Sequence, residues 1–566
     1  MRKLFILVLS LTFVLSLTAC KKDTDVVDDG EKEPVVLTML QSYSGGTQNF
    51  NPFTTSRYAF SLGFMWENLV IFDSLNNGEE HMWLAEDVIS EPDNKTLTIK
   101  VRQGVKWSDG EDFTADDVAY SYLIFKDHPA IDFYGIWGES GKLESVTVID
   151  EYTVEIVAQT ANRFNRIALI SQLPIIAEHI WSEIDEPSSY VMENPVVTGA
   201  FSEVIDFTNE MVVLGRNPYY WKGEELKIDE LRIPAVLSMD AAMSLLDSGE
   251  IDWAHAFIPD IENTYVNGHE DRHFWYGPSD GLRIAFNYMS ENEDNLKAFN
   301  DPEFKKAMSL SVDRQGILDS VLYGYVDLLV PTVTGLPTGA RGYVNPAAQA
   351  ITDQYTAYNI DLAKQTLADA GYVDIDGDGF VENPDGTPIS FEVLTPTGWA
   401  DWNDGAAISV QGIREAGIDA KAVTADPSLV YESWQTGEHD ALYTSYGTTP
   451  NIWQFYYDSI GDQTRVLTPT WWSICQTNYI NDDMTALIAQ MPTANDEELR
   501  AITNEIELFF AENVINVPII HNAFFHVYST ARFTGWASAE NPFVHPAAVI
   551  TDTKVLQLLA LVPVED

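Results

Sequence analysis

The chain has 566 residues, a formal net charge of −54 and only two cysteines. This length exceeds what one hydrophobic core supports, so we expect two or three domains. A surface this acidic repels nucleic acid, and the 45% hydrophobic and 21% charged content is typical of a soluble globular protein.

The first 20 residues predict export from the cytoplasm. Met1-Arg2-Lys3 is basic, the apolar run 4–17 follows, and small residues precede Cys20. The run is shorter than the roughly 20 apolar residues of a membrane span. The pattern resembles the lipobox of bacterial lipoproteins, which implies a signal peptide over 1–19 and lipid on Cys20. The alternative is an ordinary signal peptide with an incidental cysteine.

Residues 20–34 are polar and acidic and predict a flexible spacer between the lipid and the folded body. If Cys20 carries lipid, Cys475 is the remaining cysteine and no intrachain disulfide forms. Its neighbours Trp471, Trp472 and Ile474 favour a buried, inert thiol. We therefore expect a protein anchored outside the cytoplasm, in a periplasm or on the outer face of the cell membrane.

Strand and helix signals then alternate along the chain. Alternating apolar residues predict a strand over 97–101 and a hairpin with arms near 146–148 and 154–156. Capping side chains, first-turn prolines and terminal glycines predict helices. These are a helix after the capping box Thr114–Asp117, one from Asp301-Pro302 through 304–322 to Gly324, one from Asp361 to Gly371, and one capped by Asn495. The fold class is α/β.

Short motifs in a fixed order carry a family resemblance. They are Asn51-Pro52-Phe53, 67–70, 83–86, 101–110, 113–118, 216–221, 248–253, Ala307 with 312–314, and 363–372. The ordered set resembles the extracellular solute-binding proteins of the oligopeptide/dipeptide class of ABC importers, family 5. This resemblance implies a monomeric binding protein with an ABC permease as its partner, and no enzyme.

The resemblance also implies a periplasmic-binding-protein type II-like fold, in which two lobes joined by a hinge close on a ligand. Lobe one would span 35–292, with an extra subdomain inserted at about 80–195. Lobe two would span 293–525, and 526–566 would return to lobe one.

The tryptophans point to an oligosaccharide ligand, with a β-linked one expected. A sugar ring has apolar faces and a hydroxyl rim, which suit aromatic platforms beside carboxylates and amides. Trp399 and Trp402 supply platforms, and Asp401 and Asn403 supply polar groups, in one loop after a predicted strand. Segments 398–403 and 252–260 resemble cello- and manno-oligosaccharide binders of this class. Further ligand candidates are Trp253, Trp434 and Trp453. The alternative is that these rings fill cores.

A peptide remains the alternative cargo, because acidic residues can hold its amino terminus and the 32 Lys and Arg include partners for its carboxylate. The 10 histidines are scattered along the sequence, which disfavours nickel or haem as cargo.

An acidic, glycine-containing loop predicts one structural calcium ion, although no cofactor is required. Asp374, Asp376 and Asp378 occupy positions 1, 3 and 5 of an EF-hand-type loop, with the turning glycine at position 6. The carbonyl of Phe380 would fill position 7, and Asp385 replaces the usual Glu at position 12. The alternative is a metal-free acidic turn.

Two strings resemble catalytic motifs but lack the necessary context. His269–His273 matches H-E-x-x-H, yet turn-forming flanks predict a surface loop instead of the required helix. A secreted metallohydrolase is the remote alternative that this string supports. Residues 138–142 lack the Ser or Thr of a phosphate loop, so no nucleotide site is expected.

Overall fold

The structure of the protein is a computed structural model. The structure describes residues 33–41, 46–54, 56–73, 75–76, 78–132, 134–137, 141–171, 173–236, 239–327, 330, 332–336, 338–446, 451–460, 477–546 and 552–565. Val35–Asp566 form one compact unit, separate from Met1–Pro34. The predicted lipidation site Cys20, most of the spacer, and Cys475 lie outside the described residues. No described helix is both long enough and apolar enough to cross a membrane.

A ten-stranded mixed sheet runs through the unit in the order β14-β13-β15-β12-β16-β11-β1-β10-β9-β8. Its strands are β1 Val36–Gln41, β8 Phe201–Phe207, β9 Met211–Arg216, β10 Glu230–Pro234, β11 Trp253–His255, β12 Arg272–Phe286, β13 Phe391–Pro396, β14 Ala420–Ala425, β15 Ala441–Ser445 and β16 Asn516–Ser529. Strand β13 is parallel to β14 and β15, and β1 is parallel to β10 and β11.

The two longest strands, β12 and β16, pair antiparallel, and their register shifts between Pro278 and Gly281 and again before Arg283. On its other side β16 pairs with β11, and these two strands contribute side chains to the two largest hydrophobic cores. Alternation along a strand sends successive side chains to opposite faces. Accordingly, Trp253 and Tyr528 pack in one core, whereas Ala254 and Val527 pack in the other. Strands β11 and β16 therefore contribute to both of these cores.

A second sheet of four antiparallel strands confirms the predicted strand and hairpin. Its order is β4-β5-β7-β6, with β4 Ala85–Ser90, β5 Thr96–Val101, β6 Leu143–Asp150 and β7 Thr153–Ala158. Val148 pairs with Val154 across the hairpin, as the alternation requires. Two small sheets complete the strands: β2 Val70–Asp73 with β3 Glu79–Met82, and β17 Phe533–Thr534 with β18 Val562–Pro563.

The helices pack around these sheets, and their caps match the sequence signals in part. The α-helices are α1 Ala115–Asp127, α2 Asn165–Ile170, α3 Glu178–Trp181, α4 Met239–Ser248, α5 Glu293–Asn300, α6 Pro302–Leu310, α7 Arg314–Ser320, α8 Pro346–Thr356, α9 Ile360–Asp369, α10 Ala400–Glu415, α11 Pro427–Thr436, α12 Ile452–Ser459, α14 Asp482–Ile488, α15 Asp496–Asn513 and α16 Lys554–Ala560. The capping boxes at Thr114 and Asn495 are confirmed.

Two helix predictions were wrong in detail. The single helix expected over 304–322 is two helices, because the chain leaves the helix after Leu310 and Asp313 caps a new one, α7. Asp361 does not begin α9. Asn359 caps that helix by accepting a hydrogen bond from the Leu362 N–H, and Asp361 lies in the first turn.

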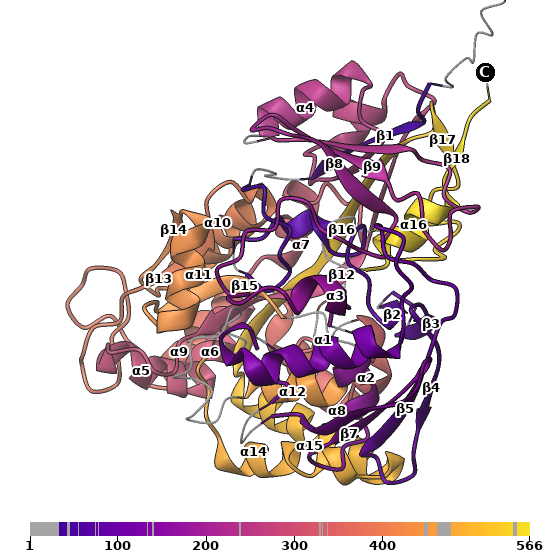
Figure 1. Ribbon diagram of the computed structural model, residues 1–566. Helices are drawn as coiled ribbons and strands as arrows, with labels where there is room; N and C mark the ends of the chain where they lie inside the picture. Colours follow the sequence, from indigo (N-terminus) through magenta and orange to yellow (C-terminus); the bar gives the residue numbers. More distant parts are fainter. Residues whose placement is uncertain are drawn as a thin grey trace, which may run out of the picture. The chain divides into compact units, whose positions relative to one another are not determined.

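The chain end returns to the core built by its first half. Figure 1 shows α16 beside the small strands β17 and β18, all in yellow, with indigo and purple N-terminal segments next to them. Val555 and Leu558 of α16 are buried in the same core as Leu37 and Phe64. Strands and helices thus mix throughout, and the predicted α/β class is confirmed.

Candidate functional site

The residues predicted to form a ligand loop lie where strand β13 ends and helix α10 begins, and the loop assignment was wrong for Asp401, Trp402 and Asn403, which belong to the first turn of the helix. Helices α10 and α11 lie beside β13 and β14 (Figure 1). The chain turns at Gly398, which has φ of +90°, and Trp399 precedes the helix as its N-cap residue. Ligands of open α/β sheets bind beyond the carboxyl ends of parallel strands, so this is a suitable place for a binding site.

Trp399 and Trp402 form an edge-to-face pair at this place. Their ring centroids are 4.8 Å apart and the rings are inclined by 80°. Trp402 is only 8% exposed and also meets the edge of Tyr443, at 6.4 Å. Trp399 is partly exposed and packs on the same core. Trp402 is therefore a core side chain that supports Trp399, and Trp399 is the one that retains accessible ring surface.

Asp401 and Asn403 lie in the same first turn of α10. The Asn522 side-chain amide donates a hydrogen bond of 3.1 Å to the Asp401 carboxylate. Burial raises the pKa of Asp401 to about 6, against the opposing effect of this hydrogen bond and of backbone N–H groups. Asn403 accepts a hydrogen bond of 2.7 Å from the Thr395 hydroxyl, which ties the helix to the end of β13.

Two further tryptophan candidates are core residues and do not reach this turn. Trp253 is fully buried, with its ring edge-to-face against Trp536 at 5.9 Å. Trp434 is 7% exposed and packs in a small core with Val430 and Leu442. Composition and flanking residues do not distinguish such rings from ligand platforms, because both are surrounded by apolar and turn residues in the sequence.

Trp453 is partly exposed but belongs to a different contact. Its ring stacks on Tyr457 at 5.1 Å and faces Phe164 at 6.4 Å with an interplanar angle of 12°. Beside it, the Arg163 guanidinium donates to the carbonyl of Ala494 at 2.8 Å and pairs with Asp496 at 2.5 Å. Trp453 therefore packs helix α12 against Phe164, while Arg163 joins the same segment to residues 494–496.

The structure adds polar residues that the sequence analysis did not identify. Asn522 and His521 lie in the irregular middle of β16, and His521 Nδ1 is 3.1 Å from the carbonyl of Ser279. Arg341 contacts the other ring nitrogen of His521. Burial, assisted by Arg341, lowers the pKa of His521 to about 4. Since no motif surrounds these residues, the glycines at 277 and 281 were the available signal of an irregular strand.

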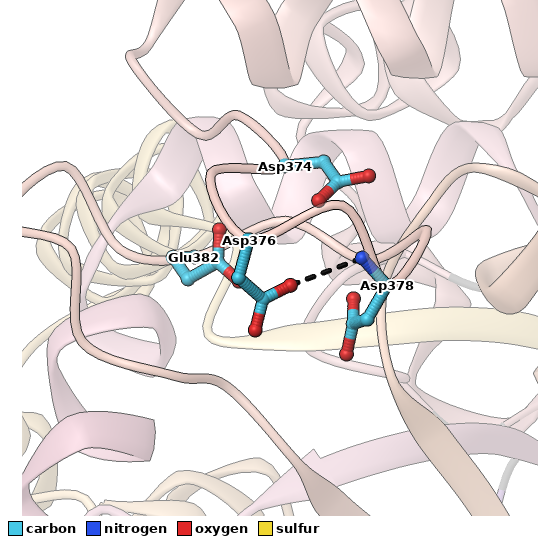
Figure 2. Close-up of side chains that lie close together, drawn as sticks. All are labelled: Asp374, Asp376, Asp378 and Glu382. Atoms are coloured by element: carbon cyan, nitrogen blue, oxygen red, sulfur yellow. Dashed lines mark hydrogen bonds between the residues drawn. The ribbon is translucent and has the colours of Figure 1, made fainter.

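Four carboxylates gather in the acidic loop, and they differ from the predicted set. Asp374, Asp376, Asp378 and Glu382 offer oxygens that all lie within 4.8 Å of one another (Figure 2). Asp374 accepts hydrogen bonds from the N–H groups of residues 377 and 379, and Asp376 accepts one from the Asp378 N–H. These bonds hold the loop in a turn that brings the carboxylates together.

Asp385 is not part of this cluster, which corrects its assignment as position 12. Its carboxylate instead pairs with Lys297 at 2.7 Å and accepts from the Thr387 hydroxyl at 2.7 Å. Glu382, at position 9 of the loop, is the fourth carboxylate of the cluster and is 8% exposed. Asp is also one methylene shorter than Glu, so it reaches less far. The predicted carbonyl ligand Phe380 follows Gly379 in the same turn.

The H-E-x-x-H string does not form the helix that a zinc protease needs. His269 lies in a turn region, whereas His273 belongs to strand β12 and stacks on Tyr528 at 5.3 Å. The predicted surface loop is therefore correct for the first part of the string only. Among the described residues, the acidic loop is the one cluster of three or more side chains with metal-binding geometry.

Comparison with known proteins identifies related sequences. Residues 79–466 match the profile of the bacterial extracellular solute-binding proteins, family 5. The chain is 24% identical over 387 residues to the oligopeptide-binding protein AppA of Bacillus subtilis, which covers 66% of this chain and 67% of AppA. It is 26% identical over 332 residues to the periplasmic alpha-galactoside-binding protein of Rhizobium meliloti, which covers 52% of this chain and 46% of that relative.

A solved structure shares the fold. The periplasmic oligopeptide-binding protein of an ABC transporter from Thermotoga maritima superposes with a TM-score of 0.82 at 23% identity, covering 93% of this chain and 99% of that one. The mannohexaose-bound form gives a TM-score of 0.79 at 22% identity, covering 94% and 99%. This likeness confirms the predicted two-lobed, periplasmic-binding-protein fold.

Proposed function

Because this chain belongs to the bacterial extracellular solute-binding proteins of family 5, we propose that it captures an oligosaccharide and delivers it to the permease of an ABC importer. The sugar, of a β-linked kind, binds between two lobes that close on it. Closure stabilised by contacts with both lobes signals occupancy to the permease.

One observation carries the choice of cargo: a partly exposed tryptophan lies beside a carboxylate at the start of α10. Trp402 packs edge-to-face against Trp399 and supports its ring. Asp401 lies in the same turn, where its carboxylate can accept hydrogen bonds from hydroxyl groups. An aromatic face with acceptors at its edge suits a sugar ring.

The relatives support both a carbohydrate and a peptide as cargo. The Thermotoga protein is named as oligopeptide-binding, yet it holds mannohexaose in one of its structures. AppA is named for oligopeptides, and the Rhizobium relative for alpha-galactosides. A peptide is therefore the second candidate, in the same transport role.

Three further assignments belong to this proposal. Lipid on Cys20 and the spacer 20–34 anchor the receptor near its permease and so raise their effective concentration. Lobe one comprises 35–292 and 526–566, and lobe two comprises 293–525. A structural calcium ion binds Asp374, Asp376, Asp378 and Glu382, the last in place of Asp385.

A thermal-shift screen of the protein without its signal peptide tests the cargo. Cello-, manno- and xylo-oligosaccharides are compared with di- to pentapeptides and a nonapeptide, since a ligand that binds only the folded state raises Tm. We expect an oligosaccharide to raise Tm and Trp399→Ala to abolish that rise. Trp137→Ala is the matched control, because this partly buried tryptophan packs on α1. Stabilisation by peptides alone would replace the sugar with a peptide.

A further inference from the structure

We propose that Asn522 is a positioning residue that holds the Asp401 carboxylate toward the bound ligand. This role rests on the proposed function, because it assigns the ligand contact to Asp401. Asn522 comes from β16 and Asp401 from the first turn of α10, so one hydrogen bond joins the long strand pair to the candidate site.

The place of Asn522 in its strand explains why it can reach α10. Regular pairing between β12 and β16 is interrupted between Pro278 and Arg283, and His521 is the residue of β16 opposite Gly281. Interrupted pairing re-aims side chains, as bulges do near binding sites. The Asn522 amide thus points its nitrogen at Asp401, at 3.1 Å.

The side-chain oxygen of Asn522 is a second feature of this amide, because it can accept a hydrogen bond. Asn522 Oδ1 is buried and has no hydrogen-bond partner among the described residues. A buried acceptor without a donor is unfavourable because it has lost its hydrogen bonds to water, and a ligand hydroxyl could supply the missing donor. The two oxygens of Asp401 and the one of Asn522 therefore form a set of acceptors at one place.

Among the described residues, no cation contributes to the pKa of Asp401. Asp404, one turn along α10, raises its pKa, and the phenols of Tyr276 from β12 and Tyr443 from β15 lie close enough to interact electrostatically. The Asn522 side chain donates a hydrogen bond to the Asp401 carboxylate. This bond and those from the N–H groups of residues 401 and 402 lower the pKa of Asp401. Removal of Asn522 should therefore make Asp401 harder to ionise.

The test measures affinity against pH with mannohexaose and cellopentaose as probes. In the native protein, affinity should fall as the pH drops below about 6, where Asp401 takes up a proton. In Asn522→Ala the midpoint should move upward by about one pH unit, because a hydrogen bond to a charged group is lost. Asn522→Ser is a second variant with a side chain too short to reach Asp401. Asp401→Asn should remove the pH dependence.

Asn516→Ala is the matched control. Asn516 is a buried asparagine on the same strand, so its loss tests whether destabilising β16 alone moves the midpoint. A fall in affinity with an unmoved midpoint in both Asn522 variants would overturn the positioning role.

A measurement without ligand separates this inference from the proposed function. Carbon-13 NMR of labelled aspartates, with Asp401→Asn to assign the signal, follows the titration of Asp401 in the free protein. We expect the Asn522 variants to titrate about one pH unit higher than the native protein. No change in that titration would overturn the inference by itself. If the Asn522 variants show the titration shift but the native protein binds no oligosaccharide, the proposed cargo is refuted, and the ligand-directed role of Asn522 with it.

Discussion

Replacing Trp402 and Trp399 separately by alanine should separate core stability from ligand affinity. Trp402 is 8% exposed and contacts both Trp399 and Tyr443, so its removal opens a cavity in the core. A buried Trp covers 150–250 Å², worth about 4–6 kcal/mol as an upper value. Measured Trp→Ala changes in cores cost about 3–5 kcal/mol, and we expect Trp402→Ala in that range.

Trp399→Ala should cost much less stability. Its ring is partly exposed, and the lost edge-to-face contact with Trp402 is worth about 0.5–1.5 kcal/mol. With the lost apolar burial, we expect roughly 1–2 kcal/mol in total. The affinity for the sugar should instead fall sharply, because the accessible platform is gone.

Urea unfolding measures the stability of each variant and of the double variant, and calorimetric titration measures affinity. The double-mutant cycle should show a coupling of about 0.5–1.5 kcal/mol between the two rings. A Trp402→Ala protein within 1 kcal/mol of the native free energy of unfolding would refute its assignment as a core support. Unchanged sugar affinity in Trp399→Ala would refute the platform.

Two further predictions concern carboxylates. Calcium added to the chelator-treated protein should stabilise it by about 2.7 kcal/mol at 100 times Kd. Asp376→Asn should abolish this stabilisation, whereas Asp385→Asn should keep it, because Asp385 pairs with Lys297 outside the cluster. Calorimetry that shows no heat of calcium binding would refute the site. Burial raises the pKa of Glu67 from 4.5 to about 7, even though the Trp83 indole donates to it at 2.6 Å. The folded state therefore keeps a proton that the unfolded state loses, so stability falls by up to about 3 kcal/mol as pH rises from about 4.5 to 7. Glu67→Gln should flatten this dependence in urea unfolding at pH 5 and 7, and an unchanged slope would contradict the assignment.

Local chemistry explains why much of the fold could be predicted from the sequence. Caps such as Thr114 and Asn495 act on N–H groups two or three residues away, and strand alternation along 97–101 reports burial directly. The break at 311–313 was missed because a cap inside an apolar-periodic run looks like a continuous helix.

The sequence by itself determined the α/β class, the order of motifs, and the segment after a strand that carries Trp399 and Asp401. Only the tertiary structure decided which tryptophans are accessible, because burial depends on segments distant in the chain: Trp253 is enclosed by Trp536, whereas Trp399 remains partly exposed. Contacts with distant segments also explain why Asp385 lies outside the acidic cluster and why Asn522 reaches the binding site. The Asp385 carboxylate pairs with Lys297, and a shift in strand register brings Asn522 to Asp401.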